Sequence, residues 1–229
     1  MLRWALAPLT ALVATASMAQ VSGSAAVVSD ERVRGVSLSN GQPAAQVDVS
    51  YDHDSGLYAG AFASNVQFYQ HSPQELQLIG YAGYARRIQP GWSVDAGAAY
   101  ASFSADSDYN YTELHVGVAT DAASARLYFS PNYFGQSIHT LYAELNGSYR
   151  LGERFKLIGH AGLLQGFAGA TGQTGGNHPH DDLLAGVEYH VQAFALQVSR
   201  VFNDGASRLY PVGAAHTHGV LTARVSMTF

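Results

Sequence analysis

Alternation between apolar and polar side chains recurs along this chain of 229 residues and limits its fold more than any other feature. The stretch from Leu221 to Phe229 is typical, because its odd-numbered residues are all apolar and its even-numbered residues are all polar. Successive side chains of a β-strand point to opposite faces, so this pattern predicts a strand with one apolar and one polar face. A helix would instead repeat its apolar residues three and four positions apart.

Twelve segments are predicted to be strands on this basis, and they cover approximately residues 21–36, 47–52, 57–66, 75–84, 92–100, 113–118, 126–130, 141–150, 155–163, 182–191, 194–199 and 219–229. Ser29 and Glu31 interrupt the apolar face of the first segment, which predicts a bulge or an early exit from the membrane there. The predicted connections alternate between short (53–56, 87–91, 121–124, 152–154, 192–193) and long (37–43, 67–74, 103–110, 134–139, 166–181, 203–217). Such alternation is typical of outer-membrane barrels, which have short periplasmic turns and longer extracellular loops.

The composition supports the same fold class. Only 13% of the residues are charged, about half the usual share of soluble proteins, while 47% are hydrophobic. No run of 18 apolar residues follows residue 19, which excludes a transmembrane helix, and the absence of cysteine excludes disulfides and thiolate zinc sites. The net charge of −5 argues against nucleic acid as a partner. We therefore predict one all-β domain, a 12-stranded antiparallel up-and-down transmembrane barrel over residues 20–229.

The first 19 residues are typical of a cleaved secretory signal peptide. Arg3 supplies a short positive region, residues 4–16 form an apolar region, and Ser17-Met18-Ala19 is a small-x-small cleavage site. The domain that follows is therefore expected to reach the cell outer membrane of a bacterium with two membranes. Aromatic side chains on the apolar faces, near the short turns, are expected to form a girdle at the membrane interface: Tyr51, Tyr84, Trp92, Tyr149, Phe155, Phe194 and Phe229.

Two sets of residues resemble known barrel motifs. The alternating Val225, Met227 and Phe229 resemble the C-terminal insertion signal of outer-membrane barrels, which implies the barrel assembly machinery and membrane lipid as partners. Most of the remaining chain resembles the TorF-type porin family, through residues 28–37 (Val-Ser-Asp-x-Arg-x-Arg-Gly-x-Ser), 43–46, 56–66, 109–113 and 128–133. Glu31 and Val33 replace residues that are usually aromatic in this family, and the loop 166–181 is unusually long. The resemblance implies a porin-like outer-membrane barrel and names no solute.

Charged residues on the predicted inward faces are the candidate pore lining: Arg32, Arg34, Asp48, Glu75, Asp95, Glu113, Arg126, Glu144, Arg150, Lys156, Glu188 and Arg224. Because isolated buried charges are very costly, these groups must be paired or solvated. One hypothesis is a charged constriction that sets solute preference, and the other is a set of salt bridges that plug and stabilise the barrel. Arg126, Arg150 and Lys156 are expected to lie close together as a basic arc near the periplasmic end.

Histidines in the predicted extracellular loops, at positions 178, 180, 216 and 218, are of a metal-ligating type, but no strand fixes their geometry. No metal site and no cofactor are predicted from them. Some twelve-stranded barrels are lipid hydrolases with a serine and a histidine on the outer wall. Here His115, His160 and His190 fall on the inward faces and no G-x-S-x-G motif occurs, so no catalytic residues and no enzymatic activity are predicted.

The predicted function is passive diffusion of small hydrophilic solutes through an outer-membrane porin. Two alternatives stay open at this point. One is a non-conducting barrel with a structural or adhesive role, in which loops close the interior. The other is a soluble exported β-sandwich, whose strands would also alternate.

Overall fold

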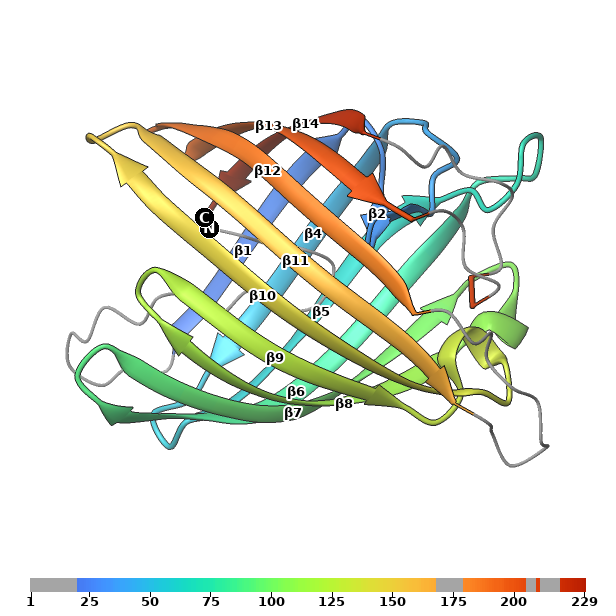
Figure 1. The fold of residues 1–229 in the computed structure, drawn as a ribbon, viewed down its shortest axis with the longest axis horizontal. Helices are drawn as coiled ribbons and strands as arrows, with labels where there is room; N and C mark the ends of the chain where they lie inside the picture. Colours follow the sequence, from blue (N-terminus) through green and yellow to red (C-terminus); the bar gives the residue numbers. More distant parts are fainter. Residues whose placement is uncertain (1–19, 168–178, 205–208, 211–218) are drawn as a thin grey trace.

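Twelve strands close into a single antiparallel barrel in the computed structural model, which describes residues 20–167, 179–204, 209–210 and 219–229 (Figure 1). Going once around the wall, the order is β1, β14, β13, β12, β11, β10, β9, β8, β7, β6, β5 and β4. Their bounds are β1 Gln20–Val28, β4 Ala44–Asp52, β5 Leu57–Val66, β6 Glu75–Gln89, β7 Trp92–Phe103, β8 Tyr111–Thr120, β9 Ala123–Ser130, β10 His139–Leu151, β11 Phe155–Phe167, β12 His180–Val191, β13 Phe194–Asn203 and β14 Val220–Thr228. The predicted fold class is confirmed, and the β-sandwich is excluded.

Among the described residues, helix is limited to two short 3₁₀ turns, η1 Ser107–Tyr109 and η2 Tyr133–Gly135. No helix in the described ranges has the length and apolar character needed to cross a membrane.

The seam between β1 and β14 closes the wall. Gly23 and Phe229 exchange backbone hydrogen bonds, with N···O distances of 2.9 and 3.0 Å. The Phe229 ring lies directly over Gly23, where an added Cβ would come within 2.5 Å of a ring carbon. Glycine therefore makes room for the aromatic residue at the seam, and closure gives every wall strand two hydrogen-bonded neighbours.

The outward face of the wall is apolar and the inward face is polar. The large hydrophobic side chains that alternate along the strands are exposed, for example Leu114 at 52%, Leu145 at 62% and Leu221 at 70%. The seven aromatic residues expected in the girdle are also exposed, near the short turns. A soluble protein buries such side chains, so this reversed polarity is that of a barrel whose outer face contacts lipid.

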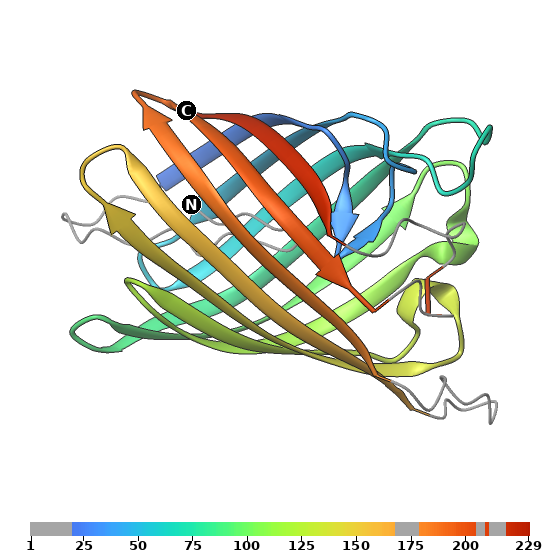
Figure 2. The same ribbon diagram turned by 45° about the horizontal axis from the view of Figure 1, so that its top comes forward.

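The connections separate the barrel into two ends (Figures 1 and 2). The short turns 53–56, 90–91, 121–122, 152–154 and 192–193 define the turn end, on the left of Figure 1. The longer connections define the loop end, on the right. The β6–β7 turn is shorter than the predicted 87–91, because β6 continues to Gln89 through an irregularity in register after Arg87.

The prediction of one strand over residues 21–36 is wrong beyond Val28. The chain leaves the wall there and folds back inside the barrel as a small hairpin, with β2 (Arg32–Val33) paired to β3 (Val36–Ser37). We call residues 29–39 the inner hairpin. Its turn residues Arg34 and Gly35 have φ values of 50° and 77°, as a two-residue type I′ turn requires. The polar residues that spoil the apolar face, Ser29 and Glu31, mark the position where the strand ends.

Apolar side chains pack tightly inside the loop end. Val33, Val36 and Leu38 of the inner hairpin contact a group of aromatic residues from the wall and the loops, and none of the three is more than 4% exposed. We call this group the loop-end cluster; its buried aromatic members are Phe68, Tyr81, Phe103, Tyr111, Tyr128, Tyr133, Phe134, Tyr142 and Tyr210. The Phe103 and Phe134 rings stack with centroids 5.7 Å apart. The loop end is thus filled by a dry core, although the wall around it is that of a channel-forming barrel.

Candidate functional site in the barrel interior

The inner hairpin crosses the interior from one side of the wall to the other. Arg34 lies at its tip, and Arg34 Nη2 donates to Glu113 Oε1 of β8 over 2.7 Å. Around the wall, four strands separate β1 from β8 on one side and six on the other. The hairpin starts at the end of β1, so the ion pair joins it to the opposite part of the wall.

Three tyrosine rings surround the Arg34 guanidinium. Its central carbon Cζ lies 4.1 Å from the ring centroid of Tyr142, 5.0 Å from that of Tyr133 and 5.6 Å from that of Tyr128. All three distances are within the range of cation–π attraction. The side chains of Arg34 and Glu113 are 4% and 2% exposed, so the charges are buried together. We call Glu113, Tyr128, Tyr133 and Tyr142 the Arg34 box.

Two further strands hold the backbone of the hairpin tip. His180 Nε2 of β12 contacts the Arg34 carbonyl oxygen at 2.9 Å, and Asn203 Nδ2 of β13 donates to the Gly35 carbonyl over 2.6 Å. A Cβ on Gly35 would lie 2.8 Å from Asp182 Cβ, in addition to needing a positive φ. Only glycine fits the tip at this position.

The prediction from the sequence that His180 lies in an extracellular loop is wrong. His180 begins β12, points inward with 1% exposure, and its Nδ1 lies 2.5 Å from Asp204 Oδ1. The alternating pattern at the start of β12 is not evident from the sequence, because the adjacent residues have the composition of a loop. His178, His216 and His218 lie outside the described residues. Within the described ranges no group of three metal-ligating side chains comes together.

The base of the inner hairpin contains its own polar network. Asp30 Oδ2 accepts from Arg32 Nε over 2.6 Å, while Asp30 Oδ1 accepts from the hydroxyls of Ser37 and Ser39 at 2.5 and 3.0 Å. Arg32 is therefore paired within the hairpin rather than lining an open pore. These bonds keep the hairpin folded as a unit in which Asp30 and Arg32 satisfy each other.

Glu31 attaches the base of the hairpin to the wall near the seam. The Gln46 amide donates to Glu31 Oε2, and Arg224 donates to Gln46 Oε1. Glu31 is only 1% exposed, and this burial raises the pKa of its carboxyl from 4.5 to about 7, against the opposing effect of the Gln46 hydrogen bond. The ionised form of Glu31 is thus disfavoured while the hairpin is docked.

A belt of polar pairs lies in the wall beside the hairpin. Asp95 Oδ2 contacts His115 Nε2 at 3.0 Å and Arg126 Nε at 3.4 Å, and the Tyr58 hydroxyl contacts the same His115 nitrogen at 3.0 Å. The inward charges of β5, β7, β8 and β9 thus form one buried group.

A second group of polar contacts joins β10, β11 and β12. Asp182 contacts His160 Nε2 at 2.7 Å and the Tyr142 hydroxyl at 3.1 Å. Glu144 accepts from the Tyr128 hydroxyl over 3.1 Å and from the Asn146 amide over 3.2 Å. These contacts fix two of the three rings of the Arg34 box, those of Tyr128 and Tyr142.

The remaining candidate pore-lining residues lie in different surroundings. Asp48 accepts from the Tyr81 hydroxyl over 3.2 Å, and Glu75 sits at the loop end, where it accepts from the Ala105 backbone N–H. Lys156 Nζ lies 3.9 Å from Glu188 Oε1. Arg150 is exposed at the turn end of β10. Most of the predicted charges are therefore engaged in buried pairs, while Arg150 and Lys156 are the more accessible ones.

The expected basic arc of Arg126, Arg150 and Lys156 is not formed. Arg150 is directly opposite Lys156, but Arg126 is opposite Glu144, six positions away along β10. At about 3.3 Å per residue, this separates Arg126 from the other two by about 20 Å. The prediction of this arc takes the depth of each residue in the barrel from its distance to the nearest turn. This depth is wrong for Arg126, because tilted strands in a closed barrel are staggered.

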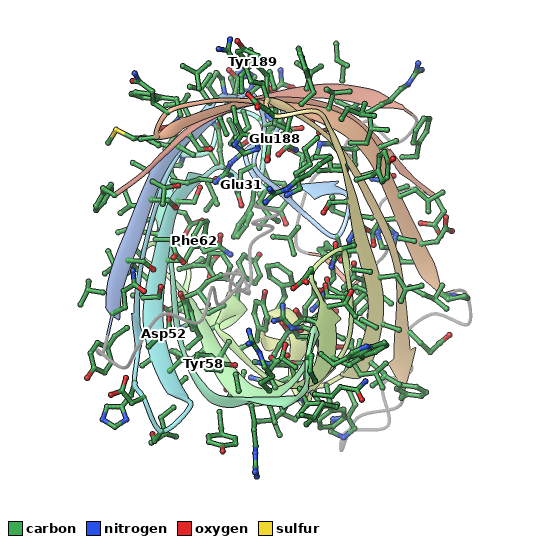
Figure 3. All side chains as sticks on the ribbon, turned by 90° about the vertical axis from the view of Figure 1, so that its left-hand side faces the viewer. Glu31, Asp52, Tyr58, Phe62, Glu188 and Tyr189 are labelled. Atoms are coloured by element: carbon green, nitrogen blue, oxygen red, sulfur yellow. The ribbon has the colours of Figure 1, made fainter. Side chains whose placement is uncertain are left out.

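Small polar residues line the interior at the turn end. Eight of the inward positions there are glycine or serine and are partly exposed: Ser22, Gly83, Ser93, Gly97, Ser124, Ser148, Gly186 and Ser226. Arg150, Lys156 and His190 share this inward face beside the turns. We call this region the turn-end vestibule. Figure 3 looks into the barrel from this end and shows Glu31 inside the wall of strands.

A small cavity of about 40 Å³ separates the hairpin tip from the wall. Its lining includes Arg34, Tyr128, Tyr142 and, beyond the Arg34 box, Glu144, His160 and Asp182. The candidate pore-lining residues predicted from the sequence include Arg34, Glu113 and Glu144 of this region, but not Asp182, the tyrosines or Asn203. The alternation of the sequence predicts that these side chains point inward. Their convergence on Arg34 depends on strand register and on the course of the hairpin, which the alternation does not give.

Comparisons with known proteins agree with this architecture. The sequence profile of Gcw_chp, described as a bacterial protein of unknown function, matches residues 13–226. The chain belongs to this family. None of the curated proteins compared with the chain matches it significantly.

Several of the similar solved structures are porins. The KdgM porin superposes with a TM-score of 0.54 at 13% identity, covering 91% of this chain and 98% of its own. The NanC porin superposes with a TM-score of 0.55 at 11% identity, covering 92% and 99%. A second KdgM structure, in complex with disordered oligogalacturonate, gives a TM-score of 0.54 at 12% identity. At these identities the likeness establishes that this Gcw_chp protein has the porin barrel fold, and nothing about its solute.

Proposed function

We propose that this Gcw_chp protein is an outer-membrane channel for the passive diffusion of small hydrophilic solutes, and that the inner hairpin closes it in the state described above. The observation that carries the proposal is the polarity of the closed wall, which is apolar outside and polar inside. A continuous polar inner face in a ring of twelve strands supports a water-filled path.

The position of the inner hairpin supports the closed state. Residues 30–39 are all buried, and Val36 and Leu38 are fully buried. The hairpin belongs to a connection, so it can leave the interior without breaking the hydrogen bonds that pair one wall strand with the next. Its own backbone bonds to the wall, from Ser29 to Ala223 and from Gln67 to Leu38, are the ones that would be lost. Conduction then requires the hairpin to move, whereas the vestibule below it is already lined by small polar residues.

Planar-bilayer recording tests the proposal directly. We expect the purified chain to show rare, small conductance steps, and a variant with residues 30–39 replaced by a short glycine–serine linker to show frequent steps several times larger. Heat-modifiable gel migration of both proteins provides the control for folding. Folded proteins that give no steps, with or without the hairpin, would contradict the channel function.

The second candidate is a non-conducting barrel with a structural or adhesive role. The dry loop-end cluster favours it, because the cluster together with the inner hairpin fills that end of the interior. The hairpin-replacement variant distinguishes the two candidate functions, because it conducts only if the protein is a channel.

The cellular setting is also part of the proposal. Residues 1–19 are proposed to be a signal peptide. The barrel assembly machinery is proposed to recognise Val225, Met227 and Phe229. The chain is also proposed to belong to the TorF-type porins within its wider family. The exposed apolar wall and the aromatic girdle support an outer-membrane location. N-terminal sequencing of protein extracted from outer membranes tests both the location and cleavage before Gln20. No catalytic activity is proposed, in line with the inward position of His115, His160 and His190.

A further inference from the structure

We propose that the Arg34 box is a binding site for small organic cations, in particular guanidinium compounds, and that Arg34 occupies it as an internal ligand in the closed state. The inference builds on the proposed channel function, because it names a class of solute that would meet this site inside the barrel.

The box has the composition of a cation receptor. Three tyrosine rings lie within 6 Å of the guanidinium carbon, and a carboxylate receives one of its N–H groups at 2.7 Å. Aromatic faces attract cations through the ring quadrupole, and a carboxylate gives the planar guanidinium a directed, charge-assisted partner. Rings and carboxylate together favour a guanidinium over an anion or a neutral sugar.

Arg34 is held by groups that do not depend on it. Glu113 belongs to β8, Tyr128 to β9, Tyr142 to β10 and Tyr133 to η2, whereas Arg34 belongs to the separate inner hairpin. The Tyr142 hydroxyl is fixed by Asp182 and His160, and the Tyr128 hydroxyl by Glu144. The box is therefore expected to keep its shape when the guanidinium leaves, as a preorganised site does.

The charge left behind also calls for a cation. Glu113 is 2% exposed, and its second oxygen, Oε2, has no hydrogen-bond partner among the described residues. Glu144 and Asp182 line the adjoining cavity, in which Arg32 is already paired with Asp30 and His160 with Asp182. Without Arg34, the Glu113 carboxylate would be buried without a counter-charge, which is strongly unfavourable.

Chemical rescue tests the inference on the full-length protein. In the Arg34→Ala variant, methylguanidinium should bind with at least about tenfold higher affinity than to the parent protein by titration calorimetry, since the internal competitor is gone. Methylguanidinium should also block the conductance of this variant in bilayers. Methylurea, which has a similar shape and no charge, is the matched control and should neither bind nor block.

Changes in the box identify the site. Added to Arg34→Ala, the Glu113→Gln and Tyr142→Leu changes should each weaken methylguanidinium binding, while Tyr142→Phe should retain most of it because the ring remains. Binding that survives Glu113→Gln, or that is equal for methylurea, would overturn the inference.

Two further outcomes are separable. If Arg34→Ala does not give a heat-modifiable folded band, Arg34→Gln, which keeps the first part of the side chain and removes the guanidinium and its charge, replaces it in the titrations. A folded variant that conducts but binds no methylguanidinium contradicts the cation site and leaves the channel intact. Binding without conductance in any variant contradicts the channel and leaves the cation site intact.

Discussion

The two ends of the barrel interior are built from opposite materials. The loop end is filled by aromatic rings and by the buried Val36 and Leu38 of the inner hairpin, which exclude water. The turn end carries many glycine and serine residues on its inward face, together with Arg150 and Lys156, and these residues are at least partly exposed. The wall strands run through both ends without interruption, so the difference arises from the inward side chains that they carry at each end and from what the connections place between them.

This difference separates stability from permeation. A dry, close-packed half stabilises the protein as any globular core does, and it does so with residues that also close the path. The open half contributes little packing and presents a polar surface to solutes. We therefore expect mutations in the two halves to have different consequences, and the predictions below are ordered from the largest expected effect to the smallest.

Thiol labelling gives the largest contrast, because the chain contains no cysteine of its own. A membrane-impermeant maleimide should label Val36→Cys at least about a hundredfold more slowly than Ser93→Cys, since reaching residue 36 requires an opening that costs a few kcal/mol. Rates are measured by mass spectrometry on the folded protein. Equal rates would show that the two halves are equally open.

Core truncation distinguishes the halves by stability. Phe134→Ala removes a ring that is 1% exposed and stacked on Phe103, and it should lower the free energy of unfolding by about 3–5 kcal/mol. Ser124→Ala in the turn-end vestibule should change it by less than about 0.5 kcal/mol. Urea unfolding in detergent, followed by tryptophan fluorescence, measures both. A small effect of Phe134→Ala would mean that the loop-end cluster does not stabilise the fold.

The pH dependence of hairpin docking follows from Glu31. Its pKa is about 7 when the hairpin is docked and 4.5 when it is free, so the docked state binds more protons between these values. Docking is therefore strongest below about pH 4.5 and weakens by on the order of 3 kcal/mol as the pH rises to about 7, with no further change above that. The labelling rate of Val36→Cys, divided by that of Ser93→Cys, should rise at least about tenfold between about pH 5 and about pH 8.

Glu31→Gln supplies the control for this pH effect. The amide cannot ionise, so the same ratio should stay constant over the range. A pH-dependent ratio in this variant would place the effect on another group.

Charge removal at the turn end should have the smallest effect. Arg150→Gln combined with Lys156→Gln should shift the reversal potential of the hairpin-replacement variant by only a few millivolts toward cations, because both groups are close to bulk solvent and are screened. Arg126→Gln instead breaks a buried contact with Asp95 and should appear as lost stability. A large reversal-potential shift from the first pair would restore a role for these residues as a filter.

The wall could be predicted from the sequence because the direction of a strand side chain is a local property. The faces of Leu114 and Glu113, for example, follow from their immediate neighbours, and the structure places them outward and inward as expected. The two ends could also be distinguished, since connection lengths are visible in the sequence.

The interior could not be predicted in the same way. The hairpin turn places Arg34, a residue with a Cβ, at a positive φ, and no local pattern announces an Arg-Gly type I′ turn. The partners of the tip, His180 and Asn203, are brought there by strand register. The error over Arg126 has the same origin, because stagger between tilted strands is a property of the closed barrel as a whole.

The hydrogen bonds at the hairpin tip also have a consequence for folding. One bond joins residues that are 146 positions apart in the chain, and the other joins residues that are 168 positions apart. The inner hairpin, which follows β1 directly, therefore finds these partners only when β12 and β13 are in place. Contacts of such long sequence separation form late and slowly, after the entropy of closing the intervening chain has been overcome. Seating of the hairpin is therefore a marker of completed assembly, and an unfinished barrel would still have its interior unblocked.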